Sequence, residues 1–242
     1  MKKGINTRNI IGIVLAGGYG TRLFGPMGGS KGLFLLNGRP LIEYSLSTIQ
    51  YAGANEIVIV VREDDFELRS KYSDYRQILD SGRGTFSAVL AAAKYAVDRQ
   101  ADAIISSCDL VCSITTAKSL VSGLFKNSDW LASFGVTPIA NDQTPIWVHS
   151  EDSGRILDYG KEIQSSTYAF ASIRFASLSF LQLIINTASN LILEDINTDT
   201  KLMRHLIINE KAIVGAIDIG QALDVDDVTD AEIAKGIVQT FE

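Results

Sequence analysis

The sequence has no apolar run that approaches the roughly 20 residues a helix needs to cross a bilayer. The segment that begins Met1–Asn6 is polar and does not resemble the apolar centre of a secretory signal. Basic residues are in the minority, since 22 Lys and Arg stand against 28 Asp and Glu, for a formal net charge of -6. DNA, RNA and anionic membranes select clustered basic surfaces, so we expect neither a nucleic acid nor a membrane as partner. We expect a cytoplasmic protein.

Cysteine and histidine are also scarce, with two residues of each type. Cys108 and Cys112 lie close together, while His149 and His205 are far apart in the sequence. These four residues do not have the spacing of a common zinc site. We expect both cysteines to be buried free thiols, as is usual in a reducing compartment.

The length and composition indicate one folded domain. The 242 residues can bury a substantial core, and 46% of them are hydrophobic and 21% charged. No internal repeat, low-complexity tract or obvious linker interrupts the sequence. We therefore expect a single domain over residues 1–242, with halves at about 8–135 and 136–242 that differ in pattern.

The first half alternates between strand-like and helix-like segments. Ile10–Ala16 is a continuous apolar run, typical of a strand buried on both faces of a parallel sheet. The other expected segments are strands at Glu56–Val61, near Ile78 and at Ala103–Ile105, and helices from Pro40 to about Gly53 and at Phe86–Val97. This rhythm predicts an α/β, Rossmann-like, mostly parallel sheet with helices on both faces, whose ligands bind at the carboxyl ends of the strands.

The second half has a different pattern. Strand-like segments at Gln143–His149 and Thr167–Phe175 flank the turn Asp152–Gly154, which predicts a small antiparallel insertion that covers the ligand site. The remaining expected segments are a helix at Leu178–Ile192, a strand at Ala212–Ile217 and a closing helix at Asp230–Val238.

A glycine-rich stretch follows the first strand. Leu15–Leu23 reads L-A-G-G-Y-G-T-R-L, and a second glycine-rich piece ends at Lys31. Glycines after a buried strand let the backbone approach a ligand and turn N–H groups toward a phosphate, and Arg22 and Lys31 add positive charge. A dinucleotide fingerprint would need glycine at Leu23, and a Walker A motif would need glycine at Ser30, so neither motif is present.

This stretch resembles the signature of the nucleotidyltransferase superfamily, L-A-G-G-x-G-T-R-L followed by a lysine. The superfamily includes sugar-phosphate nucleotidyltransferases, cytidylyltransferases for alcohol phosphates and the molybdenum-cofactor guanylyltransferase. Four further segments are similar to its later motifs: Gly38–Ile42, Gly84–Val89, Ser107–Asp109 and Asp224–Asp230. The resemblance spans most of the chain and implies the nucleotide-diphospho-sugar transferase fold, with the first half binding nucleotide and the second half binding acceptor and closing the site.

The resemblance also implies the residues of the site. It assigns nucleotide binding to Leu15, Ala16, Gly17, Gly18, Gly20, Thr21, Arg22, Lys31, Gly84 and Thr85. Arg22 and Lys31 would act in catalysis by opposing charge on a leaving pyrophosphate. Lys161 falls where the superfamily often places a lysine that holds the acceptor phosphate. Ser172 and its neighbours stand where that family often has a glycine against the sugar, which disfavours a hexose acceptor.

Magnesium is the implied cofactor. Asp109 ends an apolar strand, where a hard oxygen ligand faces the crevice. Asp226 is the expected second ligand because the family's late aspartate returns to the same ion, and Asp224 is left open as its substitute. Asp227 and Asp230 are expected to cap a helix.

These expectations describe an enzyme, a nucleotidyltransferase. A phosphate oxygen of the acceptor, a sugar 1-phosphate or an alcohol phosphate, attacks the α-phosphorus of an NTP, and pyrophosphate leaves. The segment Gly160–Ile163 and the short C-terminal region favour CTP. Residues Gly28–Lys31 form a compact loop that favours the alternative of a molybdenum-cofactor-type guanylyltransferase.

A second alternative is a non-catalytic, nucleotide-binding regulatory protein. It is disfavoured because all four charged positions of the motif are filled, by Arg22, Lys31, Asp109 and Asp226. The nucleotide base, the identity of the acceptor and the oligomeric state, including a homo-oligomer, stay open.

Overall fold

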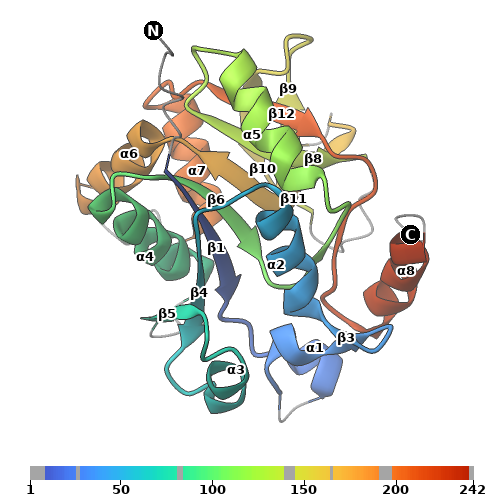
Figure 1. The fold of residues 1–242 in the computed structure, drawn as a ribbon. Helices are drawn as coiled ribbons and strands as arrows, with labels where there is room; N and C mark the ends of the chain where they lie inside the picture. The colour runs from blue at the N-terminus through green and yellow to red at the C-terminus, as the bar shows by residue number, and fades with distance from the viewer. Residues whose placement is uncertain are drawn as a thin grey trace, which may run out of the picture.

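The computed structural model describes residues 9–25, 28–80, 84–138, 145–163, 166–190 and 198–239. Nine strands of this part of the chain form one central sheet, flanked by helices (Figure 1). The helices are α1 (Thr21–Phe24), α2 (Leu41–Tyr51), α3 (Phe66–Lys71), α4 (Thr85–Asp98), α5 (Thr116–Lys126), α6 (Leu178–Asn190), α7 (Asp199–Ile208) and α8 (Val228–Gln239). The strands are β1 (Ile10–Ala16), β2 (Leu35–Leu36), β3 (Arg39–Pro40), β4 (Glu56–Arg62), β5 (Arg76–Asp80), β6 (Asp102–Ser107), β7 (Leu110–Val111), β8 (Ala132–Thr137), β9 (Trp147–Ser150), β10 (Ile156–Gly160), β11 (Tyr168–Ala176), β12 (Val214–Asp218) and β13 (Leu223–Asp224).

The first half builds a parallel core. Strand β1 lies between β4 and β6 and is parallel to both, and β5 extends the sheet beyond β4. Alternate residues of β1 face opposite sides: Ile11 and Ile13 pack with α4 and α6, whereas Val14 packs with α2 and α5 (Figure 1). Apolar side chains on both faces explain why the strand is a continuous hydrophobic run.

Helix α2 lies unusually close to β1 at Gly12. A Cβ atom at this position would lie 2.0 Å from Cγ2 of Ile49, so only glycine permits the contact. The close approach fixes α2 against the strand whose end carries the glycine loop.

The second half continues the same sheet with antiparallel strands. Strand β11 pairs antiparallel with β6, β8 and β9, and β10 pairs with β9. The register of β11 against β8 shifts between Phe170 and Arg174, where Ser172 has a positive φ of 48°. The bulge turns this part of the strand and re-aims the Ser172 side chain.

The predicted fold class is confirmed, and the antiparallel strands join the central sheet rather than standing apart from it. Helix α7 and strand β8 were not among the predicted segments. The predicted strand at Gln143–His149 corresponds to β9, and its first two residues lie outside the described residues, as do the last two of the predicted helix Leu178–Ile192. No described helix is long and apolar enough to cross a membrane.

Both cysteines are free and buried, as expected from the sequence. Burial raises the pKa of Cys112 to about 11 and holds the pKa of the Cys108 thiol above its usual range. Because the thiolate is the reactive form, we expect neither thiol to react with a disulfide reagent at pH 8 in the folded protein, and both to react in denaturant. A fast reaction of either thiol in the native protein would contradict this burial.

Candidate active site

A cavity of about 430 Å³ opens at the carboxyl ends of β1 and β6. Most of the residues predicted from the sequence line it: Leu15, Gly17, Gly18, Arg22, Lys31, Gly84, Thr85, Asp109, Lys161 and Asp226. Ala16, Gly20 and Thr21 do not. The Ala16 side chain points into the core cluster beside α2, because successive strand residues face opposite sides. The cavity therefore draws on both halves of the chain.

The glycine loop brings Lys31 back over the end of β1. Gly20 precedes α1 in a left-handed conformation with φ 57°, and the Gly29 amide donates to the Tyr19 carbonyl at 2.8 Å. A Cβ atom on Gly18 would lie 3.3 Å from Cδ of Lys31. The loop thus folds on itself, and glycine at position 18 leaves room for the lysine side chain.

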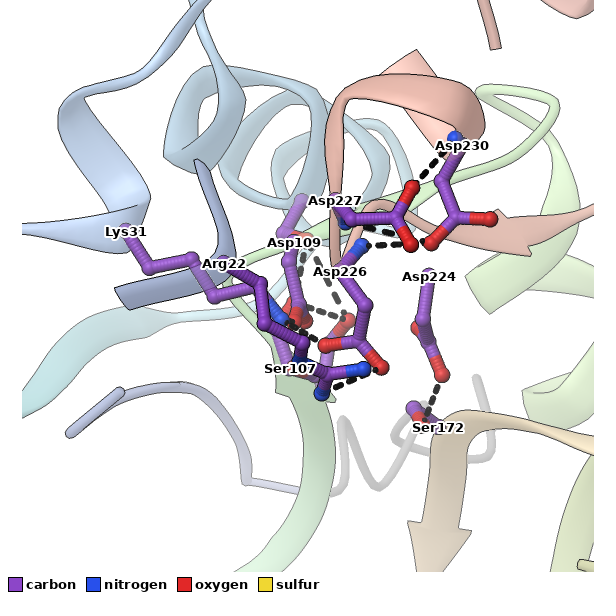
Figure 2. A network of polar contacts seen from close by, with 11 residues as sticks. Arg22, Lys31, Ser107, Asp109, Ser172, Asp224, Asp226, Asp227 and Asp230 are labelled. Carbon is purple, nitrogen blue, oxygen red and sulfur yellow. Dashed lines mark hydrogen bonds and ion pairs between the residues drawn. The ribbon is translucent and has the colours of Figure 1, made fainter. Parts of the chain in front are cut away.

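Lys31, Asp109 and Asp226 form one charge cluster in the cavity. The Lys31 ammonium makes ion pairs with both carboxylates, and Arg22 Nη2 lies 3.1 Å from Oδ2 of Asp226. Figure 2 shows Lys31 reaching both aspartates and Arg22 reaching Asp226. Ser107 donates a further hydrogen bond to Asp109. Three segments remote in sequence meet here.

The cluster shifts the pKa values of its members in opposite directions. Burial by itself would lower the pKa of Lys31, but the charges of Asp109 and Asp226 outweigh it and raise that pKa well above its usual range. Burial by itself would raise the pKa of Asp109, but the Lys31 charge together with hydrogen bonds from Lys31 and Ser107 outweighs it, so the pKa is lowered. The Lys31 ammonium and the Asp109 carboxylate are therefore charged at neutral pH.

A short antiparallel pair places the late aspartates. Strand β13 pairs with β7, and the Val225 amide donates to the Asp109 carbonyl at 3.0 Å. Asp230 accepts hydrogen bonds from the Asp226 and Asp227 amides, at 3.0 and 3.2 Å. Asp227 in turn accepts from the Asp230 amide at 3.0 Å. Asp227 and Asp230 thus cap the start of α8 as predicted.

Asp224 has a different environment from Asp226. Its Oδ2 accepts a hydrogen bond from Ser172, and its buried Oδ1 has no partner among the described residues (Figure 2). Burial, and then the charge of Asp109, raise the pKa of Asp224 to about 8. The Asp224 carboxyl is therefore largely protonated at neutral pH.

The cluster has the donors that a divalent cation needs. Mg²⁺ is usually held by one or two protein carboxylates together with substrate phosphates. Asp109 and Asp226 already converge on one positive group, so a cation between them would contact both. Within the described residues no group of three acidic, histidine or cysteine side chains gathers around one point. The residues present fit a magnesium ion completed by ligand oxygens.

The second half supplies a wall that the sequence reasoning missed. It includes Phe170, Arg174, Asp199 and Thr200 beside the predicted Lys161. Arg174 and Asp199 are buried and form a two-pronged ion pair. An arginine inside the otherwise apolar segment Tyr168–Ala176 was the available signal, because such a residue needs a buried partner.

Comparison with known proteins identifies the family. The sequence profile of the MobA-like NTP transferase domain matches residues 12–158, which is more than half of the chain. The chain belongs to this family. The domain's profile spans the glycine loop, Lys31 and Asp109, and it ends before the wall that contains Arg174.

Two curated relatives match parts of this chain. A probable molybdenum cofactor guanylyltransferase from Thermococcus gammatolerans is 40% identical over 73 residues, which cover 30% of the chain and 36% of the relative. A glucose-1-phosphate thymidylyltransferase from Mycolicibacterium smegmatis is 31% identical over 115 residues, which cover 47% and 38%. The match therefore spans little more than a third of the length of each relative.

Solved structures share the fold of this chain over nearly its whole length. The inositol-1-phosphate CTP transferase from T. maritima has a TM-score of 0.77 at 18% identity and covers 95% of this chain and 96% of its own. A structure described as a glucose-1-phosphate thymidylyltransferase from Bacillus anthracis, in complex with sucrose, has a TM-score of 0.77 at 14% identity and covers 96% of both. At these identities the likeness concerns the fold.

Arg62 is a second residue that the sequence reasoning missed. It ends β4, is only 6% exposed, and its guanidinium carbon lies 3.7 Å from the centre of the Tyr19 ring. Its Nη1 donates to the Gly17 carbonyl at 3.3 Å, and its Nε donates to Asp64 at 2.8 Å. Arg62 thereby fastens the glycine loop to the neighbouring strand.

We expect Arg62→Ala to loosen the glycine loop. Loss of the ring contact and the hydrogen bond removes about 1–2 kcal/mol of local stability, so amides of residues 17–25 should exchange ~5- to 30-fold faster with deuterium. Mass spectrometry of the loop peptides measures this rate. Arg69→Ala, which removes a surface arginine over the Phe66 ring, is the matched control. Equal loop exchange in the two variants would show that Arg62 does not hold the loop.

Proposed function

We propose that this chain transfers a nucleoside monophosphate from an NTP to a phosphorylated small molecule, with Mg²⁺ bound and pyrophosphate released. One observation carries the proposal: the glycine loop, Lys31, Asp109 and Asp226 line a single cavity in a chain of the MobA-like NTP transferase family. Lys161 lines the same cavity from the second half. The cavity thus has cationic groups on both walls.

Positioning and charge neutralisation carry the reaction in this proposal. The attacking acceptor phosphate is ionised at neutral pH, so no strong base is needed. The difficulty is to bring two polyanions together. Arg22 and Lys31 oppose the charge on the departing pyrophosphate, and Lys161 holds the acceptor phosphate. No covalent enzyme intermediate is formed.

Asp109 and Asp226 would hold Mg²⁺, which when bound would neutralise negative charge on the phosphates. Lys31 lines the same cavity, where its ammonium would pair with phosphate. Asp226 is favoured over Asp224 because it already shares a cation with Asp109, whereas Asp224 is hydrogen bonded to Ser172. The contacts in the cavity thus support different roles for the two late aspartates.

The nucleotide and the acceptor are proposed at a coarser level. CTP is favoured by the likeness of Gly160–Ile163 to alcohol-phosphate cytidylyltransferases. GTP with a molybdenum-cofactor acceptor is the competing assignment, supported by the compact Gly28–Lys31 loop and by the similarity to the Thermococcus gammatolerans protein. Both assignments require the same charge cluster.

Pyrophosphate release tests the proposal. The assay combines Mg²⁺ and each NTP with a panel of acceptors: hexose 1-phosphates, inositol phosphate, glycerol phosphate, phosphocholine and molybdopterin. We expect pyrophosphate release with one NTP and one acceptor class.

Lys31→Ala should lower the turnover number ~10²- to 10³-fold, because a preorganised charge opposite the leaving group is lost. Lys118→Ala, a lysine over the Tyr51 ring, is the control. Bound NTP without release across the panel would favour the regulatory alternative, and unchanged turnover in Lys31→Ala would remove that lysine from the reaction.

Metal binding tests the assignment of the aspartates. With Mn²⁺ as a paramagnetic probe and NTP present, we expect Asp109→Asn and Asp226→Asn each to weaken binding at least ~10-fold, since each removes a charged ligand. Asp224→Asn should bind Mn²⁺ as the unchanged protein does. Titration followed by electron paramagnetic resonance measures these affinities. The reverse order for Asp224 and Asp226 would make Asp224 the second ligand.

A further inference from the structure

We propose that the Arg174–Asp199 ion pair selects an acceptor with neighbouring hydroxyl groups and discriminates against one that carries a quaternary ammonium group. The inference rests on the proposed function and names the acceptor class for the same cavity. Both residues line the cavity, and their side chains are only 4% and 10% exposed. They come from β11 and from the first turn of α7, so the pair joins two elements of the second half.

The pair is a costly feature that fold stability alone does not require. Burying two charged groups costs hydration free energy, and their mutual attraction offsets this cost only in part. Apolar residues of similar size in the same place often stabilise a protein as well or better. Here the pair borders a ligand-sized cavity rather than a closed core. Arg174 Nε also has no hydrogen-bond partner in the part of the chain that the structure describes. The protein therefore leaves polar capacity unused at this wall.

Asp199 has acceptor capacity left on the cavity side. Arg174 Nη1 donates to Oδ1 at 3.0 Å and Nη2 donates to Oδ2, which uses one acceptor site on each oxygen. A carboxylate has about four such sites. Two neighbouring hydroxyl groups of a ligand can donate to the two remaining sites, and Thr200 also lines the cavity. The spacing of a carboxylate's two oxygens suits such a diol.

The charges and aromatic rings of this wall argue against an acceptor with a second anionic group or a quaternary ammonium group. Asp199 neutralises Arg174, so a second anionic group on the acceptor would meet a carboxylate rather than a free cation. Quaternary ammonium groups are recognised by open aromatic faces. The guanidinium of Arg174 already lies over Phe134 and Phe170, at 5.2 and 5.0 Å from the ring centres. Phe170, the ring that lines the cavity, therefore already carries the protein's own cation.

Calorimetry with acceptor probes tests the inference directly. With Mg²⁺ and a non-hydrolysable NTP analogue bound, the probes are inositol 1-phosphate, glycerol 3-phosphate, glucose 1-phosphate, propyl phosphate and phosphocholine. We expect at least one hydroxyl-bearing probe to bind ~10- to 100-fold more tightly than propyl phosphate and phosphocholine, because hydrogen bonds to a charged group are made only by the former. Absence of this preference, or tightest binding of phosphocholine, would overturn the inference.

Variants link the preference to the ion pair. Asp199→Asn alone would leave Arg174 buried without a counter-charge and risks misfolding, so the test uses Arg174→Leu combined with Asp199→Leu. This double variant should lose the preference while its affinity for the NTP analogue is unchanged. The control combines Arg204→Gln with Asp158→Asn, which removes a two-pronged but partly exposed pair that joins α7 to β10 and does not line the cavity.

The outcomes separate this inference from the proposed function. A preference that survives in the Leu double variant, or that is lost equally in the control, would overturn the role of Arg174 and Asp199, even where pyrophosphate release establishes the transferase reaction. A preference that disappears only in the Leu double variant supports the hydroxyl-reading role. Such a result with no pyrophosphate release from any probe would contradict the proposed reaction instead.

Discussion

The structure depends on a lysine ammonium held between two aspartates. Unpaired, any one of these charges would be costly to bury, and the two carboxylates alone would repel each other. Lys31 arrives on a folded-back glycine loop, Asp109 at the end of β6, and Asp226 just after β13. Each segment must therefore reach one point to within hydrogen-bonding distance. Glycine at positions 18 and 20 and the short β7–β13 pair meet that requirement.

The two halves of the chain differ in how they build their walls. The parallel half ends several strands at one edge, so its ligand groups come from the loops that follow those strands. The second half instead places side chains from within β11, and its bulge at Ser172 turns part of that strand. Arg174 and Phe170 lie on either side of this bulge. The wall proposed for the acceptor can thus change by substitution in one strand without disturbing the glycine loop.

The parallel core could be predicted because its strands are continuous apolar runs that end in recognisable motifs. Helix α7 was missed because no clear pattern in the preceding residues marks where it begins. Its N-cap, Thr198, cannot be told from any other threonine by the sequence alone. The return of Asp226 to the place of Asp109 was expected from family resemblance, because no spacing rule reaches so far. The ion pairs that Lys31 makes with both aspartates were not predicted. Arg174 and Asp199 are 25 residues apart and meet only through the packing of α7 near β11. Residue types could not reveal that packing.

The β6–β11 pairing also bears on how the protein is made. A chain emerging from the ribosome folds from its N-terminal side, so β1, β4, β5 and β6 are available well before β11. Until β11 is added, β6 is an open sheet edge with unpaired backbone groups, which is a known route to wrong association between chains. Asp226 arrives later still. A partly synthesised chain therefore exposes the edge of β6 at a stage when Asp226 is missing and the cation site cannot yet hold a ligand.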